Sequence, residues 1–279
     1  MRRIASTDKK EVKRNGNQKA MLVVSFGTSY EDTRKATIEA CERKIDKAFS
    51  AYEVRRAFTS NMIIKKLKER DNMVVDTPEQ ALVKLREEGF SEVIVQSLHI
   101  LNGAEYHDLE AEVAKFEGSF DRLVIGKPLL TGVDDYLNAA EALKNQMPSL
   151  ADNEAVVWMG HGTYHFANAA YACLDYVFED IGMKNTFVGT VEGYPELDSV
   201  IKKLKKHRIE KVTLMPLMLV AGDHAQNDMA GDEEDSWKVV LEKQGFAVDV
   251  YMHGLGENEG IQEMYMSHAK AAVEGQTGY

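Results

Sequence analysis

Two related stretches of this sequence indicate its fold: VIVQSLHILNGAEYHDL (93–109) and VTLMPLMLVAGDHAQND (212–228). They align at a constant offset (212 − 93 = 119), with Gly103 opposite Gly222. Each begins with an apolar run of the kind that forms a strand buried on both faces, and each continues into a turn of small and polar residues. A repeated strand and turn predicts that the chain contains two related halves.

A second match supports the repeat. Gly27-Thr28 aligns with Gly162-Thr163 at another offset (162 − 27 = 135), so the halves align only with gaps. Around these matches, short β-rich runs alternate with amphipathic stretches typical of solvent-facing helices. The predicted strands are 21–26, 53–58, 92–98, 123–126, 154–159, 185–191, 211–219 and 247–252. The predicted helices are 31–49, 61–70, 78–88, 105–117, 165–181, 195–207, 233–244 and 258–274.

Individual residues mark some of the helix ends. Thr77 is the expected N-cap of a helix that has Pro78 at its first position and Gly89 just past its end. Asp232 is expected to cap the helix at 233–244 in the same way.

Strands that alternate with helices form parallel sheets covered by helices on both faces. We therefore expect an α/β fold of two similar Rossmann-like domains, related by a pseudo-twofold repeat, with the active site in the cleft between them. The expected division is a flexible tail (1–20), a first domain (21–148) and a second domain (149–279) whose terminal helix packs back on the first.

Composition narrows the function. The 279 residues carry a formal net charge of −11, which argues against binding to nucleic acid or to an anionic membrane surface, since both need basic patches. Residues 1–20 lack the apolar core of a secretory signal, and no run approaches the roughly 20 apolar residues that span a bilayer. Cys41 and Cys173 are interpreted as buried thiols in a reducing compartment. These features predict a cytoplasmic protein.

Two histidines directly follow predicted buried strands. His161 lies between glycines in WMGHGT (158–163), where a flat ligand can approach the backbone. His224 has Asp223 and Asp228 nearby, either of which could orient its ring. Because strand ends in duplicated α/β folds face a shared cleft, we expect the two imidazoles on either side of that cleft.

Two carboxylates extend the predicted site. Glu105 falls opposite His224 in the repeat and could accept a proton or bind metal transiently. Glu192, in TVEGYP (190–195), could join the imidazoles in a ligand set suited to cobalt, nickel, iron or zinc; the alternative is a solvated glutamate in a first helical turn. His99 ends a strand and could line the cleft.

Other residues suit an anionic ligand. Gly27-Thr28-Ser29 could bind an anion at the start of the next helix. Arg55 and Arg56 are unusual within a strand, and they indicate either bidentate contacts to ligand carboxylates or an edge strand with salt bridges. No Gly-x-Gly-x-x-Gly follows the first strand and no Walker loop is present, so no nucleotide is expected. The residues expected to contact the ligand are Ser25, Gly27, Thr28, Arg55, Arg56, Gly162 and Thr163.

The chain resembles the anaerobic class of sirohydrochlorin cobaltochelatases, type II chelatases that also resemble ferrochelatase in fold. Six segments in order carry the resemblance: SFGTSYEDTR (25–34), RRAFTSNMI (55–63), VQSLHILNGAEY (95–106), GHGT (160–163), VEGYPELD (191–198) and PLMLVAGDHAQNDMAGD (216–232). The resemblance implies metal-site histidines at His161 and His224, a metal-proximal glutamate at Glu192, and the acidic residue of the first domain at Glu105.

The activity that this resemblance implies is insertion of cobalt(II) into sirohydrochlorin, or its precorrin-2 form, with release of two protons in anaerobic cobalamin biosynthesis. Cobalt is then a substrate, and neither ATP nor a prosthetic group is expected. Ligand type does not fix the metal, so iron and nickel insertion remain alternatives. A carrier that holds a metal or tetrapyrrole without turnover is a further alternative, and a homo-oligomer is possible.

Overall fold

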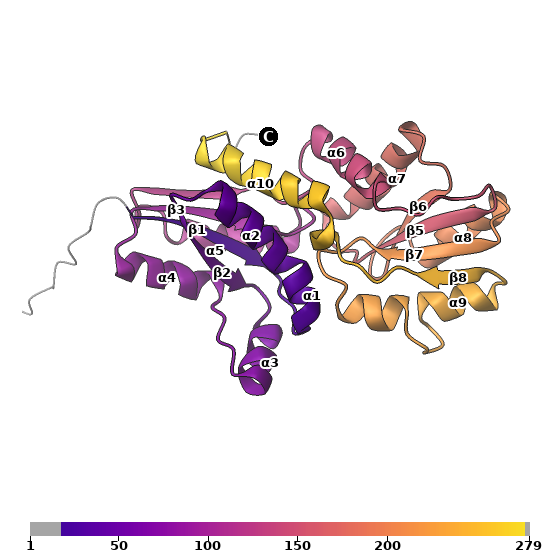
Figure 1. Ribbon diagram of the computed structural model, residues 1–279, viewed down its shortest axis with the longest axis horizontal. Coiled ribbons are helices and arrows are strands. Elements are labelled where there is room, and N and C mark those ends of the chain that lie inside the picture. The colour runs from indigo at the N-terminus through magenta and orange to yellow at the C-terminus, as the bar shows by residue number, and fades with distance from the viewer. Residues whose placement is uncertain (1–17, 277–279) are drawn as a thin grey trace, which may run out of the picture.

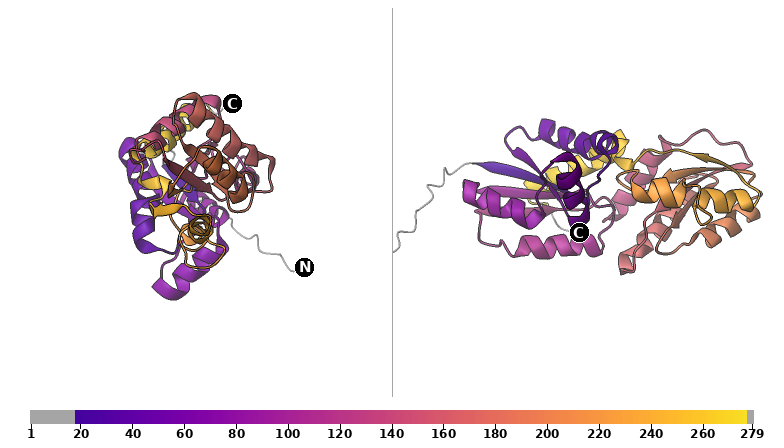
Figure 2. Two further views of the ribbon diagram at one scale, coloured as in Figure 1. Left: turned by 90° about the vertical axis from the view of Figure 1, so that its right-hand side faces the viewer. Right: turned by 90° about the horizontal axis from the view of Figure 1, so that it is seen from below.

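The protein, seen here as a computed structural model that describes residues 18–276, has two lobes side by side along its longest axis (Figure 1). Each lobe is built on one four-stranded sheet. The view from below shows the same two lobes with helices on both faces of the sheets (Figure 2). Most of the predicted tail lies outside the described residues, and its last two residues, Lys19 and Ala20, begin the first strand.

The two sheets share one strand order. It is β2-β1-β3-β4 in the first sheet and β6-β5-β7-β8 in the second, and all neighbouring strands are parallel. The strands are β1 (Lys19–Ser25), β2 (Glu53–Phe58), β3 (Glu92–Ser97), β4 (Arg122–Gly126), β5 (Glu154–Gly160), β6 (Thr186–Thr190), β7 (Lys211–Pro216) and β8 (Ala247–Val250). Both offsets of the repeat recur, between β1 and β5 (154 − 19 = 135) and between β3 and β7 (211 − 92 = 119). The predicted fold class is therefore confirmed.

The helices follow the predicted alternation. They are α1 (Glu31–Ala36), α2 (Ile38–Ala48), α3 (Asn61–Asp71), α4 (Pro78–Glu88), α5 (Ala104–Ala114), α6 (Val133–Lys144), α7 (Ala169–Asp180), α8 (Leu197–Lys206), α9 (Trp237–Lys243) and α10 (Glu259–Val273). Three short turns, η1 (Phe166–Asn168), η2 (Ala225–Met229) and η3 (Leu255–Glu257), complete the set. None of these helices of residues 18–276 is both long enough and apolar enough to cross a membrane.

Three helices differ from the sequence-based expectation. The predicted helix at 31–49 is divided at Thr37, where φ is −114° and ψ is −81°. α6 is not predicted at all. α9 begins after Ser236, whose Oγ accepts from the Val239 N–H, so Asp232 is not the cap. The acidic residues before Ser236 form bends and turns instead, because the hydroxyl caps the helix closer to its apolar face.

α10 joins the two lobes. It follows the second sheet in the chain but contacts β3, β4 and α2 of the first lobe, as well as α6 (Figure 1). One hydrophobic cluster therefore combines Met21 of β1, Trp158 of β5 and Ile261 of α10. The opposite face of each sheet has a cluster of its own. A boundary near residue 148 stays a prediction, because α6 lies before it and packs against α7 after it.

Candidate metal and tetrapyrrole site

Two imidazoles lie together at one edge of the second sheet. His161 directly follows β5, and His224 lies in the segment between β7 and η2. Their ring centroids are 4.5 Å apart and the rings are nearly perpendicular, at 87°. His161 is exposed and His224 is half-buried, so solvent reaches both. The expectation that they flank a cleft from opposite sides is wrong, because both belong to the second lobe.

The second nitrogen of each ring is already engaged. Nδ1 of His161 lies 2.8 Å from the Gly162 carbonyl oxygen, and Nδ1 of His224 lies 2.6 Å from Asp228 Oδ2. A carbonyl or carboxylate oxygen accepts hydrogen bonds, so in both rings Nδ1 carries the hydrogen and donates. The Nε2 lone pair of each ring is then free to bind a metal, which is the usual arrangement of metal-binding histidines. Asp228, rather than Asp223, orients the ring of His224.

Glu105 faces this pair from the first lobe. It lies in the first turn of α5, after Gly103 as the N-cap. Desolvation raises the pKa of its carboxyl, the nearby His161 opposes that rise, and Asp108 adds to it. A carboxyl whose pKa is raised toward neutrality is a better proton acceptor than an ordinary glutamate. Its other neighbour is His99, whose Nε2 lies 3.5 Å from Glu105 Oε2.

Glu192 approaches the site through its backbone. Its N–H donates to the carbonyl oxygen of His161 at 2.8 Å, while its side chain is exposed. Gly162 lets these two segments approach, because a Cβ there would lie 2.5 Å from the Gly193 nitrogen. Within residues 18–276, no three His, Cys, Asp or Glu side chains are close enough to form a metal site. The role of Glu192 as third ligand therefore stays a prediction.

The loop after β1 reaches across to the loop after β7. The Tyr30 hydroxyl donates to Asp223 Oδ1 at 2.7 Å, and this contact raises the pKa of Tyr30. Gly27 has φ +95°, and a Cβ there would lie 2.6 Å from the Phe58 ring, so the loop requires glycine. Thr28 is buried and accepts from the Tyr30 N–H. The two lobes are thus joined beside the imidazole pair.

Two other predicted ligand contacts lie close to strand ends. Ser25 is buried at the end of β1, and its Oγ has no hydrogen-bond partner among the described residues. The Thr163 N–H donates to Asn168 Oδ1 at 3.1 Å, and Asn168 Nδ2 donates to the Tyr194 carbonyl oxygen at 2.7 Å. Asn168 thus ties the His161 loop to the loop that carries Glu192.

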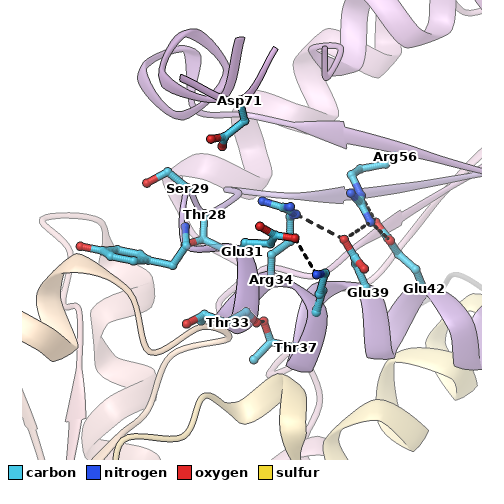
Figure 3. Close-up of polar contacts among 12 residues, drawn as sticks. Thr28, Ser29, Glu31, Thr33, Arg34, Thr37, Glu39, Glu42, Arg56 and Asp71 are labelled. Atoms are coloured by element: carbon cyan, nitrogen blue, oxygen red, sulfur yellow. Dashed lines mark hydrogen bonds and ion pairs between the residues drawn. The ribbon is translucent and has the colours of Figure 1, made fainter. Parts of the chain in front are cut away.

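The paired arginines of β2 have protein partners. Nε of Arg56 donates to Glu42 at 2.7 Å, and its guanidinium also pairs with Glu39, both on α2 (Figure 3). Arg55 donates to Glu53 and Glu88 at 2.6 and 2.7 Å. β2 is an edge strand, so of the two interpretations the structure supports salt bridges. Their role as ligands for substrate carboxylates would require these pairs to open.

An aromatic group includes His107 and His165, two histidines that the sequence places near the site but on predicted helices, which gave them little weight as site residues. The rings of His107 on α5 and His165 lie 4.9 Å apart, and Phe166 stacks on His165 with centroids 3.9 Å apart. Phe166 and Tyr164 are strongly exposed. The run Tyr164-His165-Phe166 after GHGT is the signal that could have indicated an aromatic surface near a flat ligand.

Comparison with protein families gives a match over nearly the whole chain. The family model described as cobalt chelatase (CbiK) matches residues 19–274. A Salmonella typhimurium protein named sirohydrochlorin cobaltochelatase is 49% identical over 256 residues, which cover 92% of this chain and 97% of that protein. Sirohydrochlorin cobaltochelatase CbiKC of Nitratidesulfovibrio vulgaris is 35% identical over 259 residues, covering 92% of this chain and 91% of that protein.

Solved structures share the fold at low sequence identity. SirB from Bacillus subtilis with Fe3+ has a TM-score of 0.63 and 17% identity, covering 94% of this chain and 99% of that one. DR2241 from Deinococcus radiodurans, a multi-domain protein with structural similarity to chelatases, has a TM-score of 0.59 and 15% identity, covering 91% of this chain and 55% of that one. At such identities these structures support the two-sheet α/β architecture alone.

Proposed function

The chain belongs to the cobalt chelatase family, and from that premise we propose that it inserts cobalt(II) into sirohydrochlorin in the anaerobic route to cobalamin. The observation that carries the proposal is the pair His161 and His224. In both rings the Nδ1 hydrogen is used in a hydrogen bond to the protein, which leaves both Nε2 atoms able to bind a metal. Such a pair can hold a divalent metal while one side of the metal stays open to the ring nitrogens.

The reaction exchanges two pyrrole protons for one metal ion. Sirohydrochlorin loses two N–H protons, cobalt(II) loses its bound water, and four ring nitrogens replace the protein ligands. An imidazole that has released the metal to the ring can accept one proton at Nε2, and Glu105 is the proposed acceptor of the other. Glu192 is the proposed third ligand. The proposed enzyme is a metal chelatase, which is a lyase. No step of the reaction needs ATP or a prosthetic group.

We propose that the macrocycle binds against the two loops that contain Gly27 and Gly162. Gly27 and Gly162 follow β1 and β5 and both have positive φ; a Cβ would meet the Phe58 ring at Gly27 and the Gly193 backbone at Gly162. The two glycines therefore determine the shape of the loops against which the ring is proposed to lie. The exposed Tyr164 and Phe166 add apolar surface next to the second of these loops.

The test is turnover in a visible-absorbance assay with metal-free sirohydrochlorin and cobalt(II). We expect multiple turnovers by the wild type and a loss of at least about 100-fold in rate for His161→Ala and His224→Ala. His207→Ala is the matched control, because His207 lies at the end of α8 and should leave the rate unchanged. A stoichiometric spectral change without turnover would instead support a carrier. Parallel assays with iron(II) and nickel(II) decide between the metals.

We also propose that the enzyme works in the cytoplasm. Both cysteines are free thiols, Cys41 buried and Cys173 exposed, which suits a reducing compartment. The exposure of Cys173 on α7 corrects the expectation that both thiols are buried. A homo-oligomer stays a prediction, and sedimentation of the purified protein over a range of concentrations would test it.

A further inference from the structure

A buried histidine lies directly behind Glu105. His99 follows β3 and is 7% exposed, whereas the Glu105 side chain is 55% exposed. The His99 backbone is held on both sides. Its N–H donates to Ser97 Oγ at 3.1 Å, and its carbonyl oxygen accepts from the Leu129 N–H at 2.9 Å and from the Tyr265 hydroxyl. The backbone that carries the imidazole is therefore anchored.

The contacts of Ser97 determine which ring nitrogen of His99 carries the hydrogen. Ser97 Oγ already accepts from the His99 N–H, and it also lies 2.8 Å from His99 Nδ1. The hydroxyl oxygen can accept twice, but its own hydrogen also needs an acceptor, and Nδ1 supplies one at 2.8 Å. Burial lowers the pKa of His99 to about 4, so the ring is neutral at pH 7 and its single hydrogen is on Nε2.

That Nε2–H is buried and has no hydrogen-bond partner among the described residues. A buried donor without a partner is unfavourable, because it has lost its hydrogen bonds to water. Its nearest acceptor is Glu105 Oε2 at 3.5 Å, a few tenths of an ångström beyond an ordinary N–H···O bond. His99 is buried and hydrogen bonded to Ser97, whereas the largely exposed Glu105 side chain has room to close this gap.

We propose that His99 is a positioning residue that binds one oxygen of the Glu105 carboxylate and leaves the other directed into the cleft to accept a tetrapyrrole proton. The inference rests on the proposed chelatase function. Glu105 without this anchor has several rotamers, whereas a base must lie within hydrogen-bond reach of the proton that it removes. Ser97 acts one step further back by fixing the tautomer.

The first test does not depend on turnover. Nitrogen-15 NMR of the free full-length protein reports which nitrogen of His99 is protonated, with assignment by the loss of signal in His99→Gln. We expect the hydrogen on Nε2 and a shift of that signal in Glu105→Gln. A hydrogen on Nδ1, or an Nε2 signal unaffected by Glu105→Gln, would overturn the proposal whether or not the protein is a chelatase.

The second test is kinetic. Glutamine can donate an N–H from nearly the place of Nε2, whereas leucine fills similar volume without a donor. We expect His99→Leu to lower kcat about 10-fold or more with KM for sirohydrochlorin little changed, and His99→Gln to restore most of the rate. In the Glu105→Gln background, His99→Leu should cost almost nothing further, as coupled residues behave in a double-mutant cycle.

The opposite kinetic results have distinct meanings. Equal losses in the leucine and glutamine variants, or independent effects of His99 and Glu105, would show that His99 only supports the fold. Thermal unfolding of each variant identifies such a structural defect. A wild type without chelatase activity would contradict the proposed function, and the NMR result would then decide the inference alone.

Discussion

The ring of His224 is oriented by a single carboxylate, Asp228, at 2.6 Å. Removal of such a partner typically costs 10- to 100-fold in metal affinity. We therefore expect Asp228→Ala to weaken cobalt(II) binding by about 10- to 100-fold in a titration followed by visible absorbance. Asp223→Ala is the control for lost charge, because Asp223 adjoins His224 but hydrogen bonds to Tyr30 instead. Equal effects of both substitutions would show that charge, not ring orientation, matters.

His99 makes the stability of the fold depend on pH. Burial lowers its pKa from 6.5 to about 4, so between these pH values the unfolded chain binds more protons than the folded one. The free energy of unfolding is therefore unaffected by protonation of His99 above pH 6.5 and falls as the pH drops toward 4. The loss reaches up to about 3 kcal/mol in the free energy of unfolding.

Urea unfolding at pH 7, 5 and 4 measures this effect. We expect a steeper loss of stability on acidification in the wild type than in His99→Gln, which has no titrating group at that position. Parallel pH dependences of the two proteins would show that His99 is protonated with equal ease in the folded and unfolded states.

At the level of elements, the loop after β5 depends on Gly162. Its φ is +86°, and a Cβ would lie 2.5 Å from the Gly193 backbone nitrogen. We expect Gly162→Ala to destabilise the fold by about 1–3 kcal/mol and to lower chelatase activity, because the loop that carries His161 must shift. Gly89→Ala is a matched control: φ is +87°, but no atom lies within 4 Å of the added Cβ. Similar losses in both variants would assign the effect to backbone strain alone.

Local sequence signals predicted most elements well. The Thr77 capping box, with Gln80 at the third position, begins α4, and the left-handed Gly89 ends it, as expected. Such motifs are satisfied within a few residues, so they can be read from the chain. α6 was missed because two of its apolar residues, Val133 and Leu137, are exposed and its buried face consists largely of alanines.

At the scale of the whole molecule, α10 makes the two lobes share one core. Ile261 is fully buried in the cluster that draws on both sheets. We expect Ile261→Ala to cost about 2–5 kcal/mol and calorimetry to show a single unfolding transition that moves down as a unit. Lys270→Ala, at an exposed position of the same helix, should change stability by less than about 0.5 kcal/mol. Two separate transitions, only one of them shifted, would contradict a shared core.

The repeat, the parallel α/β class and the placement of His161 and His224 after buried strands could all be predicted from the sequence. These follow from apolar periodicity and glycine turns, which are local properties of the chain. The tertiary structure was needed to show that the two imidazoles lie 4.5 Å apart and that Asp228 orients His224. Burial of His99 and the return of α10 likewise depend on surfaces that exist only once both halves have packed, because contacts between residues far apart in sequence leave no periodic pattern.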